Sequence, residues 1–149
     1  MTPLPPADDR PADASDSGPD RKGGGDDATT VAELRELVEE FVREREWSKY
    51  HSPKNLAMSI AIEAAELMEH FQWLTPEECD AAVADPHKRA AAGEELADVV
   101  GYCLAMAGAL GVDLSDTVRA KMLRNHAKYP AEVFRGRASY DRPADEDHG

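Results

Sequence analysis

EAAELMEHFQWL, residues 63–74, places two carboxylates beside apolar residues that recur with the 3.6-residue period of an α-helix. In a helical projection with about 100° per residue, an apolar stripe lies within about 60° of Glu63. It consists of Leu56, Ile60 and Leu67. Glu66 lies one step around the same helix, at about 300°. Because an unpaired carboxylate is costly to bury, a charge on the apolar face needs a partner.

A second stretch, EELADVVGYCLAMA at residues 94–107, repeats the anomaly with Glu95 and Asp98. Both pairs have i, i+3 spacing, which puts two carboxylates on one helix face. Four facing carboxylates repel one another unless cations lie between them, and oxygen ligands without cysteine or histidine favour Mg²⁺, with Mn²⁺ as a substitute. The alternative is that both pairs are ordinary surface charges. A di-iron bundle is disfavoured, because it needs Glu-x-x-His repeats and none occurs.

Outward from these stretches, the sequence predicts an all-α bundle of four long helices and a short one. The expected helices span about 31–47, 53–74, 76–84, 86–110 and 114–129. Capping residues mark most of their ends: Thr30, Thr75, Asp85 and Asp113 at starts, and Gly111 at a stop. No stretch shows the period of two that is typical of a β-strand.

Composition divides the chain into three parts. Residues 1–30 consist mainly of Asp, Pro, Gly, Ala and Ser, and we expect a disordered acidic tail there. Residues 31–135 form the predicted folded domain, and 136–149 a flexible tail. The net charge of −13 argues against binding of polymeric nucleic acid, which calls for a basic face. It does not exclude a nucleotide, because bound cations can reverse the local field.

The sequence also contains clues to the compartment of the protein and to its assembly. No signal peptide or apolar span of membrane length is apparent, and Cys79 and Cys103 form no CxxC pair, so we expect a cytoplasmic protein without a membrane partner. The helices expected at 53–74 and 86–110 are apolar around much of their circumference. A domain of this size offers them too few neighbours, so we predict a homo-oligomer that completes the core.

Five segments carry a resemblance to a known family: FVREREWSKYHSPKN (41–55), EAAELMEHFQWL (63–74), EELADVVGYCLAMA (94–107), KMLRNHAKYP (121–130) and FRGRASY (134–140). The chain resembles the MazG-like all-α nucleoside triphosphate pyrophosphohydrolases, and especially their dCTP pyrophosphatase branch. The resemblance implies an Mg²⁺-dependent enzyme that hydrolyses a nucleoside triphosphate, such as dCTP or a modified dCTP, to the monophosphate and pyrophosphate. It also implies a dimer of dimers, with sites near subunit boundaries.

The resemblance also assigns roles to individual residues. The metal ligands and catalytic residues are Glu63, Glu66, Glu95 and Asp98, the four carboxylates found above. The substrate-binding residues are Trp47, His51, Trp73, Tyr102, Lys121 and Asn125. Taken alone, the aromatic residues fit core packing equally well, and the stripe of Lys121, Asn125 and Lys128 fits a solvated face. The branch carries a histidine nine residues before Trp47, where this chain has Val38, so the base preference stays open.

Two other functions are compatible with the sequence. One is a non-catalytic helical module that senses a nucleotide or binds a partner, which predicts binding without turnover. The other is a related hydrolase of the dUTP or phosphoribosyl-ATP type. The complete set of four carboxylates argues against the first, and Trp47 with Trp73 favours the dCTP branch over the second.

Overall fold

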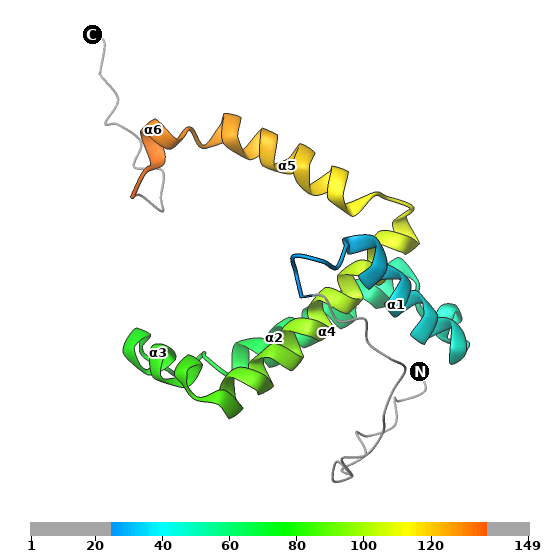
Figure 1. Ribbon diagram of the computed structural model, residues 1–149, viewed down its shortest axis with the longest axis horizontal. Coiled ribbons are helices and arrows are strands. Elements are labelled where there is room, and N and C mark those ends of the chain that lie inside the picture. Colours follow the sequence, from blue (N-terminus) through cyan, green and yellow to red (C-terminus); the bar gives the residue numbers. More distant parts are fainter. Residues whose placement is uncertain (1–24, 137–149) are drawn as a thin grey trace.

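The computed structural model describes residues 25–136, and every regular element in this part of the chain is helical. The elements are α1 (Val31–Glu44), the 3₁₀-helix η1 (Trp47–Tyr50), α2 (Pro53–Glu69), α3 (Pro76–Ala84), α4 (Pro86–Leu110), α5 (Leu114–Lys128) and α6 (Ala131–Phe134) (Figure 1). The prediction of an all-α fold with four long helices and a short one is confirmed. The structure adds two single-turn helices, η1 and α6. Residues 1–24 and 137–149, which hold most of the predicted tails, lie outside the described residues.

Local capping chemistry fixes where the helices begin. The Thr30 hydroxyl accepts a hydrogen bond from the Glu33 N–H at 3.1 Å, and the Thr30 N–H donates to the Glu33 carboxylate at 2.7 Å. The other predicted caps also accept first-turn N–H groups: Thr75, Asp85 and Asp113. Gly111 ends α4 with a φ of 64°, a left-handed conformation that glycine adopts without a steric penalty.

The end of α1 differs from the prediction. The helix ends at Glu44 rather than near residue 47, because the backbone of Arg45 leaves the helical conformation with a ψ of 1° and the Glu46 N–H donates to the Arg43 carbonyl in a tighter turn. The Arg45 side chain folds back on the last turn. Its guanidinium lies 3.6 Å from the centre of the Phe41 ring and donates to the Phe41 carbonyl at 3.1 Å. Glu46 then takes a left-handed φ of 53°. Trp47 therefore opens η1 instead of closing the first helix.

The end of α2 also comes earlier than predicted. The helix ends at Glu69 rather than Leu74, and tight turns carry the chain to the cap of α3. In these turns the Phe71 N–H donates to the Met68 carbonyl, and the Leu74 N–H to the Phe71 carbonyl, both at 3.0 Å. Trp73 therefore lies in a turn, with 85% of its surface exposed.

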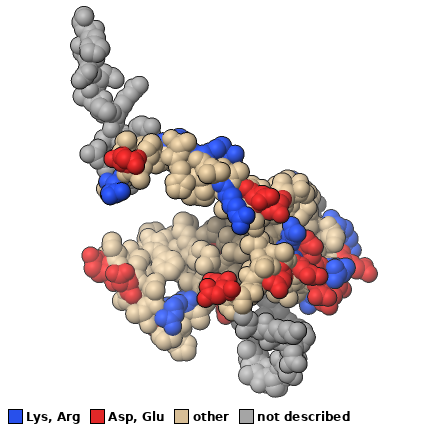
Figure 2. All heavy atoms as spheres, turned by 45° about the horizontal axis from the view of Figure 1, so that its top comes forward, with Lys and Arg blue, Asp and Glu red and all other residues tan. Residues whose placement is uncertain are grey.

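The helices form an antiparallel hairpin of α2 and α4, with α3 at the connection between them (Figure 1). α1 packs against α4 near its C-terminal end, where Gly108 comes close to Glu39. α5 leaves the end of α4 at 98° and projects as an arm, separated from the body over part of its length (Figure 2). Within residues 25–136 no single helix is long and apolar enough to cross a membrane; only α4 and α5 taken together pass that test, across this bend.

The core of the described chain is small. Its buried apolar residues are Val42, Leu56, Ala82, Leu104 and Ala107. By contrast, Met58, Ile62 and Met68 on α2 each keep more than half of their surface exposed. Burial of apolar surface is the main favourable term in folding, so these faces represent stabilisation that a single copy does not realise.

Candidate metal and nucleotide site

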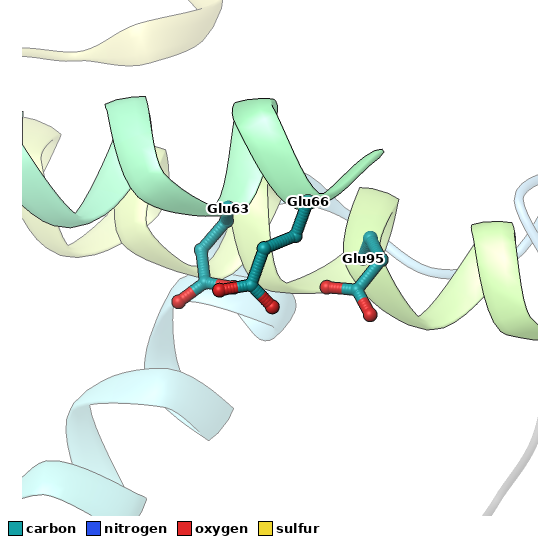
Figure 3. A group of neighbouring side chains, drawn as sticks. All are labelled: Glu63, Glu66 and Glu95. Carbon is teal, nitrogen blue, oxygen red and sulfur yellow. The ribbon is translucent and has the colours of Figure 1, made fainter. Parts of the chain in front are cut away.

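Three carboxylates meet where α2 lies against α4. Glu63 and Glu66 come from successive turns of α2, and Glu95 comes from α4; one oxygen of each lies within 4.8 Å of the others. Figure 3 shows all three side chains pointing to the same side of the helix pair. Ligands at about 2.0–2.6 Å on opposite sides of a cation are about 4–5 Å apart. The spacing and the oxygen-only donor set of this carboxylate triad therefore fit a hard divalent cation.

The pKa of Glu63 reflects its partial burial and the crowding of these carboxylates. Partial burial raises the pKa of Glu63 above its ordinary value of 4.5, and the negative charges of Glu66, Asp98 and Glu95 raise it further. Asp98 is exposed and does not belong to the group of oxygens within 4.8 Å, yet its charge acts on Glu63. The structure thus brings together three of the four predicted ligands and places the fourth within electrostatic reach.

Glu63→Gln is expected to raise the unfolding temperature of the metal-free protein at neutral pH. A raised pKa means that the folded state holds its proton to a higher pH than the unfolded chain does. The contribution of Glu63 to stability is therefore present below pH 4.5 and is lost as pH rises through the folded-state pKa. The glutamine variant carries no charge to desolvate, so its advantage should appear above pH 4.5 and vanish below it. The test is to measure melting temperatures of both proteins from about pH 4 to about pH 8, a range that begins near the ordinary carboxyl pKa.

Mg²⁺ should reverse the ranking, because a bound cation stabilises the ionised triad and needs the Glu63 carboxylate. With added Mg²⁺ we expect the melting temperature of the wild type to rise more than that of Glu63→Gln. Glu36→Gln, which removes an exposed carboxylate on α1, serves as the control and should match the wild type with and without metal. A Glu63→Gln protein that gains as much from Mg²⁺ as the wild type would contradict a metal site here.

An open hollow adjoins the triad, lined by Glu66, Glu69, His70 and Glu95. Neither Glu69 nor His70 is among the predicted site residues. A signal for His70 was available, because it follows Glu63 by seven residues and so lies on the same side of a helical projection. The hollow continues the site toward the C-terminal end of α2.

Tyr102 and His51 lie together at the other end of the site. Tyr102 follows Glu95 by seven residues of α4, which places it on the same face about 10 Å further along the axis. The His51 ring, in the connection before α2, lies 6.4 Å from the Tyr102 ring, centre to centre. Both side chains are partly exposed. The structure therefore brings these two predicted substrate-binding residues together.

The two tryptophans are not brought together within one chain. Trp47 precedes α2 and packs its ring edge-on against Phe41, with centres 5.9 Å apart. Trp73 follows α2, and the helix between them has 17 residues, or about 25 Å of length. A base pocket that uses both rings therefore needs more than one copy of the chain.

Lys121 and Asn125 are also remote from the triad in the same chain. Glu95 precedes Leu110, the end of α4, by about 22 Å along the helix axis, and α5 then leaves at 98°. The Asn125 amide contacts the Met122 sulfur on its own helix at 3.9 Å. The arm carries more basic than acidic residues. Asp116 is acidic, and the basic residues are Arg119, Lys121, Arg124 and Lys128.

Comparisons with known proteins fit this arrangement. Residues 58–140 match the model of the MazG-like family. dCTP pyrophosphatase 1 of Bos taurus is 40% identical over 109 residues, which cover 73% of this chain and 64% of that protein. The Homo sapiens protein of the same name is 42% identical over 106 residues, or 71% and 62%. The chain thus spans less than two thirds of the length of these relatives. The crystal structure of a pyrophosphatase from Archaeoglobus fulgidus aligns with a TM-score of 0.63 and 40% identity, over 67% of this chain and 92% of that one.

Proposed function

The chain belongs to the MazG-like family, and from this membership we propose that it is an Mg²⁺-dependent nucleoside triphosphate pyrophosphohydrolase. It converts a deoxynucleoside triphosphate, with dCTP or a modified dCTP as the first candidate, to the monophosphate and pyrophosphate. We further propose a role in control or sanitation of the nucleotide pool and a location in the cytoplasm. The observation that carries the proposal is the carboxylate triad, built inside the segment that matches the family and by two helices that pack on each other.

Glu63, Glu66 and Glu95 hold the cations in this proposal, with Asp98 adding charge and a further oxygen ligand. Mg²⁺, or Mn²⁺ in its place, supplies charge neutralisation on the phosphates and acidifies the attacking water. The chain itself fixes the direction from which the triphosphate approaches, because all three triad side chains point to one side of the helix pair. A glutamate of the triad that is not fully used as a metal ligand accepts the proton of the water in this proposal.

The remaining predicted residues complete the site in this proposal. Tyr102 and His51 bind the nucleoside side of the substrate, next to the triad. Lys121 and Asn125 reach the phosphates from the α5 arm of a second copy, because the arm of the same copy points away. Self-association as a dimer or tetramer is supported by the exposed apolar face of α2. A base pocket of Trp47 and Trp73 likewise combines two copies.

The carboxylate triad supports a metal-dependent enzyme over a non-catalytic module, since three carboxylates within 4.8 Å repel one another unless a cation lies between them. The base specificity depends on residues outside the triad. Val38 is partly exposed on α1 and offers no hydrogen bond to a base edge. We therefore propose dCTP-type substrates on the strength of the relatives and expect tolerance for substituents on the pyrimidine ring.

Purified protein with Mg²⁺ is expected to release pyrophosphate, rather than orthophosphate, from at least one deoxynucleoside triphosphate. The panel should contain dCTP, 5-substituted dCTP, dUTP and dTTP at equal concentration, with each product identified. Chelation of the metal should stop the reaction, and added Mg²⁺ or Mn²⁺ should restore it. Absence of pyrophosphate across the whole panel with several metals, or release of orthophosphate alone, would sink the proposal.

A further inference from the structure

Functional side chains lie at three levels along the α2/α4 pair, which we call tiers: the Tyr102 tier, the carboxylate triad, and the His70 tier with Lys88. On α4, Lys88, Glu95 and Tyr102 recur every seven residues, so they share one face at steps of about 10 Å. On α2, His70 follows Glu63 by the same interval. Because the two helices run antiparallel, the His70 end of α2 meets the Lys88 end of α4 (Figure 1). The triad therefore lies between the Tyr102 tier and a tier of basic side chains.

His70 joins the two hollows of this region. It lines the acidic hollow, whose other lining residues are Glu66, Glu69 and Glu95. It also lines a neighbouring groove with Lys88 and Arg89. The rest of that groove is apolar and consists of Phe71, Leu74, Ala82, Val83 and Ala92. An apolar floor suits the aliphatic part of a lysine, whose ammonium then stays at the rim.

The donors at this rim have no anionic partner in the described chain. Neither His70 nor Lys88 is in an ion pair within residues 25–136, although the chain as a whole carries a net charge of −13. Arg89 is partly committed, because its guanidinium donates to the Val83 carbonyl at 3.5 Å. An ammonium and an imidazole N–H beside a cluster of carboxylates are suited to an anion that bridges them to a metal site.

We propose that His70 and Lys88 form the subsite for the pyrophosphate end of the triphosphate, an inference that rests on the function proposed above. The substrate then lies along the helix pair in one direction. Its α-phosphate is at the triad, its β- and γ-phosphates are at the His70 tier, and its nucleoside is at the Tyr102 tier. This subsite belongs to the same copy as the triad, unlike Lys121 and Asn125.

The chemistry of the step explains why donors are useful there. A water oxygen bonds to the α-phosphorus and releases one proton, and the bond from that phosphorus to the bridging oxygen breaks. The electron pair of the broken bond leaves with pyrophosphate, so negative charge grows on the leaving group. N–H donors that bind this charge stabilise the transition state and hold the product afterwards.

Lys88→Met and His70→Phe are the variants of choice, because each keeps the packing of the side chain and removes only the donor. We expect the dissociation constant of Mg²⁺-pyrophosphate, measured by calorimetry without turnover, to rise about tenfold or more in each, as for loss of a charge-assisted hydrogen bond. The affinity for dCMP should change by less than about twofold, since the monophosphate lies beyond this tier. Lys88→Arg should restore pyrophosphate binding.

Lys54→Met is the control, because Lys54 lies about 180° around α2 from Glu63 and should leave pyrophosphate binding unchanged. Unaltered pyrophosphate affinity in both Lys88→Met and His70→Phe overturns the subsite. An equal loss of dCMP affinity also overturns it, because the substrate would then not run in the direction proposed. A wild type that hydrolyses no nucleotide defeats the proposed function instead, while the pyrophosphate measurement still decides the subsite.

Discussion

Glu95→Gln is expected to lower kcat for pyrophosphate release by about a thousandfold or more while the fold stays intact. Glu95 is the contribution of α4 to the triad, and its oxygen lies within 4.8 Å of those of Glu63 and Glu66. Metal ions supply several kcal/mol of charge stabilisation in such reactions, and about 1.4 kcal/mol corresponds to a factor of ten in rate. Glutamine keeps the size of the side chain but lacks the charge, so the loss reflects the site rather than the packing.

The measurement is kcat at saturating nucleotide and Mg²⁺, with circular dichroism to confirm the helical fold. Glu94→Gln is the matched control, because this exposed neighbour lies about 100° around α4 and outside the triad. It should keep at least about half of the wild-type rate. If Glu95→Gln retained about a tenth or more of the wild-type kcat, the triad would not be the catalytic metal site.

Two inactive variants are expected to restore activity to each other when they assemble together. Glu95→Gln damages the triad, and Lys121→Ala removes a phosphate ligand on the α5 arm. If each site combines the triad of one copy with the arm of another, a mixed dimer has one site with both defects and one intact site. Random pairing in a two-fold dimer then returns about one quarter of the wild-type activity.

The test is to unfold and refold the two proteins together and compare the rate with that of each protein refolded alone. A mixture of Glu95→Gln with Glu66→Gln is the control, because both changes damage the triad and no mixed dimer has an intact site. That mixture should stay inactive. Failure of the first mixture to recover would mean that Lys121 does not act across the subunit boundary.

The parts of the fold that depend on neighbouring residues could be predicted from the sequence. Caps such as Thr30 and Asp113 act within their own first turn, so their residue type alone marks the helix starts. The helix ends near Trp47 and Trp73 could not be found in this way. Both tryptophans continue the apolar pattern, and periodicity does not distinguish another helical turn from the turns that follow Arg45 and Glu69.

The features of the candidate site also differ in whether the sequence could predict them. Spacing of i, i+3 and an apolar border nominated four carboxylates, because both clues come from one helix at a time: Glu63, Glu66, Glu95 and Asp98. In the folded chain only the first three of these have oxygens within 4.8 Å of one another, and spacing alone contains no information about how α4 is turned toward α2. The 98° departure of α5 was equally inaccessible, since a short connection such as the one after Leu110 is compatible with many directions.

Because the core of the described chain is small, the amount of assembled protein should depend on how fast the chain is synthesised. Leu56 and Leu104 are among few buried side chains, and the proposed assembly supplies the rest of the burial. Stability that comes from association falls on dilution by mass action. Newly made chains at low abundance remain solitary longer and are open to proteases. The level of the assembled protein should then rise more steeply than the rate of synthesis, so that assembly requires a threshold level of expression.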